Sequence, residues 1–185
     1  MCGADEAGRG PLAGPVVSAA VILCPSSHAR LQELGLDDSK TLSAPRREHL
    51  LNTLRDVAKI GVGIAEPHEI EARNILWASL EAMSRAVREV QPDYALIDGN
   101  RMPPGLPCPG DAVVKGDSRA LCIAAASVVA KVTRDRLMVR ADARYPGYGF
   151  AQHKGYPTRA HLDALQRLGP CPIHRRGFGP VGRLL

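Results

Sequence analysis

A short stretch near the start of the chain constrains the fold most. Two adjacent carboxylates, Asp5 and Glu6, lead directly into a turn rich in glycine and proline, and the apolar run at residues 16–23 follows. Pro25 ends that run. A β-branched apolar run bounded by turn residues is typical of a buried strand. The order therefore predicts two antiparallel strands joined by a turn, with acidic side chains at the end of the first strand.

The rest of the chain mixes strand and helix patterns. Apolar residues at helical spacing predict helices over residues 43–57, 67–90, 118–140 and 158–168, the second interrupted or restarted near Asn74. Short apolar segments predict strands over residues 59–65, 94–97 and 112–114. Residues 169–182 form an irregular, basic tail. This order predicts an α/β protein with a mixed sheet.

Length and composition fit one globular domain. The 185 residues suffice to bury a hydrophobic core. The net charge of +5 and the excess of arginine suit a phosphate-bearing partner, although genome composition explains arginine richness equally well. Five scattered cysteines form no Cys-x-x-Cys pair, which argues against a disulfide framework and a zinc site. No leader or membrane-length apolar run is present, so a cytoplasmic protein without membrane attachment is expected.

Four carboxylates fall at predicted strand ends. Asp5 and Glu6 end the first strand, Asp98 ends the fourth, and Asp117 follows the fifth. Ligands of open α/β sheets bind beyond strand ends, where distant residues meet. Clustered carboxylates repel unless cations share them, and oxygen ligands favour Mg²⁺ or Mn²⁺ over zinc. The pattern therefore predicts a metal site suited to phosphoryl displacement, whose natural substrate is a phosphodiester.

Each acid also has an ordinary structural interpretation. Asp117 is a candidate N-cap, Asp98 a candidate turn residue and Glu6 a candidate solvated charge. Neighbours on a strand point to opposite faces, so Asp5 and Glu6 address one site only if the turn beginning at Gly8 ends or bulges the strand. The coincidence of four acids nevertheless favours metal binding.

Several motifs accompany these acids. They are residues 5–16 (DEAGRGPLAGPV), Asp38-Ser39-Lys40, Ile97-Asp98-Gly99, Lys115-Gly116-Asp117, residues 126–135 (ASVVAKVTRD), Lys154-Gly155-Tyr156-Pro157-Thr158 and Pro172-Ile173-His174-Arg175-Arg176. In this order and over nearly the whole chain, the sequence resembles bacterial ribonuclease HII, a type 2 ribonuclease H.

The resemblance implies an α/β, ribonuclease H-like fold, in which helices flank a mixed central β-sheet and a small helical extension follows. It implies one domain over residues 1–185, with a catalytic core to about residue 142 and a substrate-contacting segment from about residue 143. The implied activity is hydrolysis of RNA in RNA–DNA hybrids, with nicks on the 5′ side of ribonucleotides embedded in duplex DNA that leave 3′-hydroxyl and 5′-phosphate ends. Such cleavage would support removal of misincorporated ribonucleotides and RNA primers, with Mg²⁺ or Mn²⁺ in a two-ion site. No sequence feature indicates oligomerisation, so a monomer is expected.

The resemblance implies a counterpart in this sequence for each functional residue of the family. The acidic catalytic metal ligands match Asp5, Glu6, Asp98 and Asp117. The backbone of Gly8-Arg9-Gly10 matches the reader of the 2′-hydroxyl, the group that distinguishes RNA from DNA. Tyr156 matches the tyrosine that packs on the adjacent sugar, although alone it is equally a half-buried aromatic. The candidate phosphate contacts, each also consistent with a solvated charge, are Lys40, Lys154, Arg175 and Arg176.

Two rival functions remain to be weighed. One is a nucleic-acid-binding module on the same fold, and the four intact acids argue against it because negative charge repels phosphate. The other is a different nuclease of this fold, such as a Holliday-junction resolvase or a hybrid nuclease without junction preference. The opening motif and Tyr156 argue against that second alternative.

Overall fold

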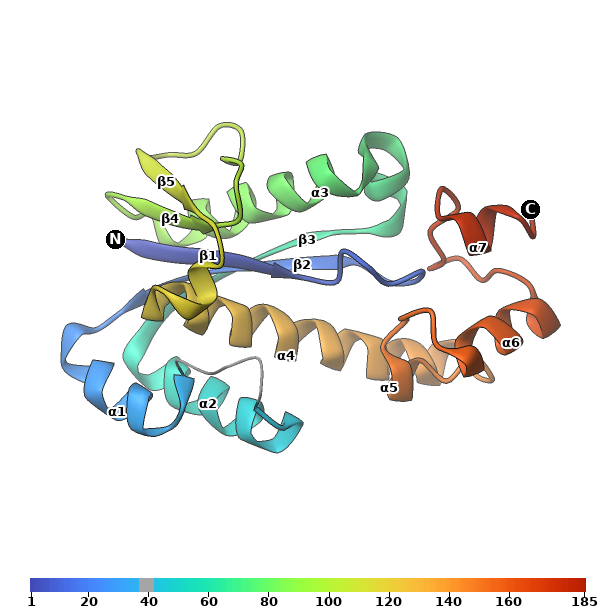
Figure 1. The fold of residues 1–185 in the computed structure, drawn as a ribbon, viewed down its shortest axis with the longest axis horizontal. Coiled ribbons are helices and arrows are strands. Elements are labelled where there is room, and N and C mark those ends of the chain that lie inside the picture. The colour runs from blue at the N-terminus through green and yellow to red at the C-terminus, as the bar shows by residue number, and fades with distance from the viewer. Residues whose placement is uncertain (37–41) are drawn as a thin grey trace.

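The computed structural model describes residues 1–36 and 42–185, and within them five strands form one sheet in the order β3-β2-β1-β4-β5 (Figure 1). The strands are β1 (Cys2–Ala7), β2 (Val16–Leu23), β3 (Ala58–Ala65), β4 (Ala95–Asp98) and β5 (Gly110–Val113). The β1–β2 and β2–β3 pairs are antiparallel, whereas β4 runs parallel to both β1 and β5. The predicted mixed sheet and its antiparallel start are confirmed.

Helices cover both faces of this sheet (Figure 1). The main ones are α2 (Ala44–Val57), α3 (Pro67–Val90) and α4 (Leu121–Arg144), and the shorter ones are η1 (Pro25–Ser27), α1 (His28–Glu33), η3 (Gly116–Ser118), α5 (Phe150–His153), α6 (Arg159–Leu168) and α7 (Gly179–Gly182). Helix α3 lies on one face, α2 and α4 lie on the other, and α5 to α7 gather at one end of the molecule. This arrangement confirms the predicted α/β architecture.

Strand β2 shows how the two cores form. Ala19 and Val21 point toward α2 and α4, where they join a cluster with Leu50 and Val128. Ala20, between them, points the other way and packs with the α3 side chains around Met83. Because side chains alternate along a strand, one apolar run supplies both faces of the sheet.

Helix α3 contains the predicted interruption. Asn74 has φ 65° and ψ 165°, outside the helical region. Its side-chain oxygen accepts hydrogen bonds from the amides of Leu76 at 3.0 Å and Trp77 at 3.2 Å. An asparagine oxygen on these amides is the geometry of an N-cap. The sequence pattern was therefore right that the helix restarts at this point.

Two predicted boundaries were wrong. Strand β5 covers Gly110–Val113 rather than residues 112–114, and α4 begins at Leu121 rather than residue 118. The reason is a separate turn of 3₁₀ helix, η3, which begins after Lys115 adopts a left-handed conformation with φ 54°. Local apolar spacing does not distinguish such a turn from the first turn of the following helix.

The C-terminal segment packs on the second half of α4. Met138 of α4 clusters with Ala13 and with Tyr148 and Phe150. Helix α6 starts where predicted, since Thr158 caps it by accepting a hydrogen bond from the His161 amide at 3.3 Å. The division of the chain at about residue 142 stays a prediction, because α4 runs through it. Over residues 1–36 and 42–185, no helix combines the length and apolarity needed to cross a membrane.

Candidate active site

Strand pairing brings Asp5 and Asp98 to the same level of the sheet. The parallel ladder between β1 and β4 ends with the pair Ala4 and Ile97, and each aspartate is the next residue on its strand. Asp5 is only 6% exposed. The amide of Gly116 donates a 2.6 Å hydrogen bond to Oδ1 of Asp98, which ties η3 to the end of β4. Residues far apart in sequence therefore meet at one strand end, as predicted.

The electrostatics of Asp5 reflect this crowding. Burial, followed by the charges of Glu6 and Asp98, raises the pKa of Asp5 to about 8. Hydrogen bonds from the Ser127 hydroxyl and the Glu6 amide, the latter at 2.7 Å, oppose the rise. A buried carboxylate among like charges is costly, and such strongly shifted groups gather at functional sites.

Glu6 reaches the site although β1 does not break at it. The antiparallel pairing with β2 continues through Asp5, Glu6 and Ala7, so neighbouring side chains keep opposite faces, and the strand ends only before Gly8. The neighbouring ladder to β4 has already stopped at Ala4 and Ile97, so Glu6 lies two residues beyond the last β1–β4 pair, and its side chain is 15% exposed. Glu6 thus lines a pocket together with Ser127, the residue that bonds Asp5. Glu6 therefore lines this pocket from near the end of β1 without a bulge, although its side chain and that of Asp5 point to opposite faces of the strand.

Glu6 forms an ion pair with Arg9. Nη1 of Arg9 lies 3.3 Å from Oε1 of Glu6. Burial raises the pKa of Glu6, while Arg9 opposes the rise and Asp98 adds to it. The two carboxylates of β1 therefore both respond to the charge of Asp98.

Asp117 lies in η3 and is 5% exposed. The N-cap of α4 is Ala120, so Asp117 is not the N-cap of that helix, and this structural interpretation is excluded. Its neighbour Gly116 binds Asp98. Asp117 therefore lies next in sequence to the residue whose amide bonds Asp98, in a buried turn.

The loop after β1 is held by two buried arginines. Arg134 of α4 donates hydrogen bonds to the carbonyl oxygens of Pro15 at 3.0 Å, Ala13 at 3.1 Å and Lys154 at 3.0 Å. Arg134 is 1% exposed. Burial lowers the pKa of its guanidinium, but an arginine stays charged at neutral pH. Three charged hydrogen bonds thus fix the end of the loop to the C-terminal segment.

Arg175 completes this support from the other side. It donates to the carbonyl oxygens of Gly8 at 2.6 Å, Arg9 at 3.0 Å and Gly14 at 2.9 Å, and it is fully buried. The direct phosphate contact predicted for Arg175 is therefore corrected: its donors are used within the protein, and its role is to hold the loop. Gly8, with φ 101°, permits this packing, because a Cβ there would lie 2.1 Å from Nε of Arg134.

Tyr156 lies beside this loop. The residue is 40% exposed, and a Cβ on Gly10 would lie 3.7 Å from Cε1 of its ring. Nζ of Lys131 and Cζ of Arg134 lie 5.8 and 5.9 Å from the ring centroid. Tyr156 and Lys131 line the same pocket as Glu6 and Gly8. The structure thus brings the predicted aromatic side chain to the predicted loop and acids.

The three remaining basic candidates, Lys40, Lys154 and Arg176, have different surroundings. Lys40 lies outside the described residues. Lys154 is half-buried, and its ammonium donates to the carbonyl oxygen of Ala151. Arg176 is exposed, and its amide binds Glu71. Of these three, Lys154 is closest in sequence to Tyr156 and bonds through its backbone to Arg134.

The sequence interpretation missed Ser127, Lys131 and Arg134, all within the quoted segment 126–135. The available signal was position: Arg134 follows Ala130 by four residues and precedes Met138 by four, in an otherwise buried stripe of α4. An arginine on an apolar helix stripe needs several partners when buried. It therefore indicates a structural anchor.

The acids suit a divalent metal ion by chemistry. Asp5, Glu6 and Asp98 offer only oxygen donors and influence one another's charge. Within residues 1–36 and 42–185, however, no three His, Cys, Asp or Glu side chains are yet arranged to hold an ion. The oxygen donor set therefore fits Mg²⁺ or Mn²⁺, whereas a preformed cage is not observed.

The comparisons with known proteins agree with this geometry. A family model described as ribonuclease HII matches residues 2–181. The chain belongs to the ribonuclease HII family. It is 56% identical over 183 residues to the ribonuclease HII of Maricaulis maris, covering 98% of this chain and 82% of that protein. It is 57% identical over 191 residues to that of Parvibaculum lavamentivorans, covering 100% of this chain and 68% of the relative.

A solved structure supports the fold. The ribonuclease H2 of Pyrococcus horikoshii superposes with a TM-score of 0.83 at 28% identity and covers 100% of this chain and 97% of that one. The ribonuclease H-like fold and the family resemblance are thereby confirmed. As a ribonuclease HII, the protein is a hydrolase, an endoribonuclease that acts on RNA in RNA–DNA hybrids.

Proposed function

We propose that this enzyme nicks on the 5′ side of ribonucleotides embedded in duplex DNA and leaves 3′-hydroxyl and 5′-phosphate ends. The observation that carries the proposal is that the Gly8-Arg9-Gly10 loop reaches both Glu6, which Arg9 contacts at 3.3 Å, and the Tyr156 ring, which lies beside Gly10. A reader of the 2′-hydroxyl must touch the sugar whose phosphodiester the acids address. In this arrangement, one short loop meets both requirements.

Asp5, Glu6, Asp98 and Asp117 are proposed as the metal ligands and catalytic acids. Divalent Mg²⁺ or Mn²⁺, as a pair when substrate is present, would supply the positive charge that stabilises the attacking and leaving oxygens of phosphodiester hydrolysis. The raised pKa of Asp5 supports this assignment, since a nearby cation relieves the repulsion among the acids. Small side-chain rotations are expected on binding, because no three acids are yet grouped around one point in the described residues.

Gly8, Arg9 and Gly10 are proposed to read the 2′-hydroxyl through their backbone. Arg9 and Gly10 are exposed, whereas Gly8 is buried against Arg134. Arg175 holds the carbonyl groups of Gly8 and Arg9, and Arg134 holds those of Ala13 and Pro15 just beyond them, so the loop is organised before substrate arrives. Tyr156, whose ring is partly exposed, is proposed to pack on the adjacent sugar. Lys154 is proposed as a phosphate contact.

The deciding experiment uses a DNA duplex with one internal ribonucleotide, incubated with Mg²⁺ or Mn²⁺. We expect a single nick 5′ of the ribonucleotide and none in the matching all-DNA duplex. Asp98→Asn should abolish the nick, since it removes a carboxylate charge from the cluster. Failure of the unmutated protein to nick this duplex would refute the proposal.

Tyr156 provides a test of junction reading. Tyr156→Ala should weaken cleavage at a single ribonucleotide more than cleavage of a long RNA–DNA hybrid, because only the former presents a deoxyribose beside the ribose. Tyr145→Ala, at another tyrosine of the same segment, serves as the control. Equal losses on both substrates would contradict the role given to Tyr156.

Metal binding has a readout that does not depend on cleavage. Ions that bind only the folded protein raise its melting temperature, and an ion concentration of about 100 times Kd adds about 2.7 kcal/mol to the free energy of unfolding. We expect Mg²⁺ to raise the melting temperature of the unmutated protein, and Asp98→Asn to reduce this rise.

In the cell, the enzyme would act in the cytoplasm as a monomer and remove misincorporated ribonucleotides and RNA primers.

A further inference from the structure

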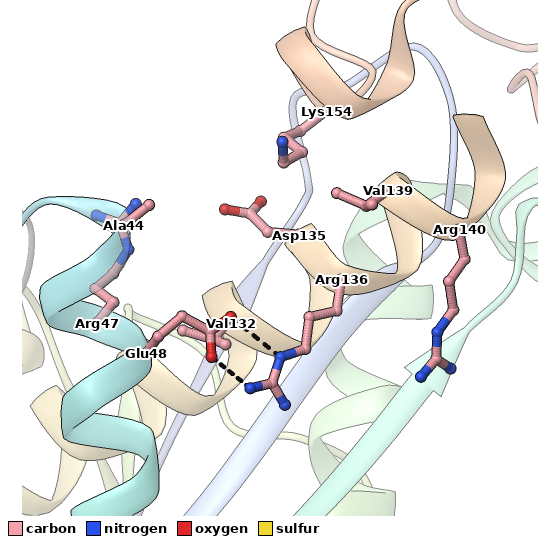
Figure 2. A pocket seen from close by; sticks show the side chains of 9 residues that line it. All are labelled: Ala44, Arg47, Glu48, Val132, Asp135, Arg136, Val139, Arg140 and Lys154. Carbon is pink, nitrogen blue, oxygen red and sulfur yellow. Dashed lines mark hydrogen bonds and ion pairs between the residues drawn. The ribbon is translucent and has the colours of Figure 1, made fainter. Parts of the chain in front are cut away.

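A second groove continues from the active-site pocket along α4. It has a volume of about 370 Å³ and lies between α2 and the segment after α5. Figure 2 shows Arg47 on α2 and Lys154 on the opposite side, with Asp135 of α4 between them. Val132 and Val139 form part of its floor on α4, and Arg140 lies at its far end.

The acidic side chains of this groove are already paired. Glu48 accepts two hydrogen bonds from Arg136, one of them at 3.1 Å from Nε (Figure 2). Asp135 accepts a 2.8 Å hydrogen bond from Lys131. Among the described residues that line the groove, these pairs leave the charges of Arg47, Arg140 and Lys154 without an acidic partner, so the described lining is net positive.

Three cations carry this excess charge. Arg47 and Lys154 each donate to a backbone carbonyl, which does not neutralise them. Within residues 1–36 and 42–185, neither these two nor Arg140 forms an ion pair with a carboxylate. Arg140 is exposed. Arginine and lysine without acidic partners on a groove wall suit phosphate oxygens.

Arg47 also lines the pocket that contains Glu6 and Tyr156, so the groove and this pocket meet at its side chain. The α4 residues of the combined surface run from Ser127 to Arg140 at helical spacing. At a rise of about 1.5 Å per residue, this length is about 20 Å. One strand of a duplex carries a phosphate about every 3.4 Å along the axis, so the surface matches about five or six nucleotides.

We infer that this groove binds the phosphate backbone of the duplex on one side of the cleaved position, through Arg47, Lys154 and Arg140. The inference rests on the proposed function, because it extends the path of that substrate. Arg47 would hold the phosphates nearest the acids, and Arg140 those farthest away. The contacts are to phosphates, so they add affinity without base specificity.

The test measures KM and kcat on duplexes that carry one ribonucleotide and whose flank is shortened stepwise, first on one side and then on the other. For the unmutated protein, KM should rise on only one side, once that flank falls below about five nucleotides. Arg140→Ala should raise KM on the long duplex and leave kcat unchanged, whereas Arg47→Ala, at the junction with the active-site pocket, should raise KM. The matched control is Arg55→Ala, which removes an exposed arginine from the same helix α2 outside the groove.

Length dependence distinguishes a groove contact from general destabilisation. On a duplex whose flank ends before the groove, Arg140→Ala should match the unmutated protein, and Arg47→Ala should show a smaller defect than on the long duplex. The loss of one phosphate contact should also reduce the salt slope of KM by about one, so the defect should be about three- to fourfold larger at 50 mM than at 200 mM salt.

Two results would overturn the inference: equal defects of the variants on long and short duplexes, or no defect beyond that of Arg55→Ala. Failure of the proposed function is seen separately, because the unmutated protein would then nick none of the duplexes. Thermal unfolding of Arg47→Ala and Arg140→Ala verifies that both variants fold. Since Arg140 is exposed and forms no hydrogen bond within the described residues, its replacement tests the groove even if Arg47→Ala unfolds.

Discussion

Replacing Arg134 by lysine tests whether a buried guanidinium holds the loop above the acids. Arg134 is 1% exposed and donates to three backbone carbonyl groups, at Pro15, Ala13 and Lys154. A lysine keeps the charge but not the planar fork, so we expect it to satisfy one of the three carbonyls. Each lost charged hydrogen bond costs about 1.5–3 kcal/mol, and two losses lower the free energy of unfolding by about 3–6 kcal/mol.

Urea unfolding of the metal-free protein, followed by circular dichroism, measures this loss. The control is Arg73→Lys, because Arg73 is exposed and forms a single 3.1 Å ion pair with Glu81. Exposed pairs contribute about 0–1 kcal/mol, so the control should unfold close to the unmutated protein.

Arg134→Lys should also affect substrate reading. The lost bonds connect the loop to the segment that carries Tyr156, so the two parts of the site would shift relative to each other. We expect cleavage at a single ribonucleotide to fall more than cleavage of a long hybrid in whatever fraction remains folded. A loss of unfolding free energy below about 1 kcal/mol would refute the reasoning, since surface substitutions produce changes of that size.

Three further predictions concern single groups. Burial lowers the pKa of His174 from 6.5 to about 4. The free energy of unfolding should therefore be highest above pH 6.5 and should fall by up to about 3 kcal/mol as the pH drops toward 4. His174→Gln should reduce this loss at low pH, and an unchanged pH profile of thermal unfolding would contradict the assignment. The pKa of Asp5 is raised from 3.8 to about 8, so its ionisation lowers the free energy of unfolding as the pH rises through that range. Asp5→Asn should raise the melting temperature of the metal-free protein at pH 8 and abolish cleavage. A lower melting temperature would count against repulsion among the acids. Gly8→Ala should lower the free energy of unfolding by about 2 kcal/mol or more, because φ is 101° at this position and the new Cβ would meet Arg134. Gly177→Ala, with open space around the added Cβ, should unfold like the unmutated protein.

The main elements of the fold were predictable because they depend on local patterns. The apolar run of β2, the proline at the start of α2 and the cap at Thr158 each have a nearby chemical cause. The restart of α3 at Asn74 was likewise visible, since asparagine favours caps over helix interiors. The boundaries of β5 and α4 were wrong because η3 uses the same kinds of residues as a helix start.

The buried residues of the site were less predictable. Arg175 was expected on the surface, because charge alone suggests a solvated or phosphate-binding side chain. Its burial depends on the carbonyl groups of Gly8, Arg9 and Gly14, which are more than 160 positions away in sequence. The support given by Arg134 was missed for the same reason.

The sequence by itself determined which groups were candidates for the chemistry, namely the carboxylates at strand ends and the glycine loop after Glu6, and the family resemblance added Tyr156. Local spacing and residue type suffice for this, because acids, glycines and prolines limit what their own segment can do. Only the tertiary structure decided how these groups meet. Strand pairing set Asp5 level with Asp98, and it left Glu6 beyond the last β1–β4 pair, where it lines a pocket with Gly8 and Tyr156. Such relations depend on the register of strands and on buried charges that find their partners across the fold, and neither is encoded in any one segment.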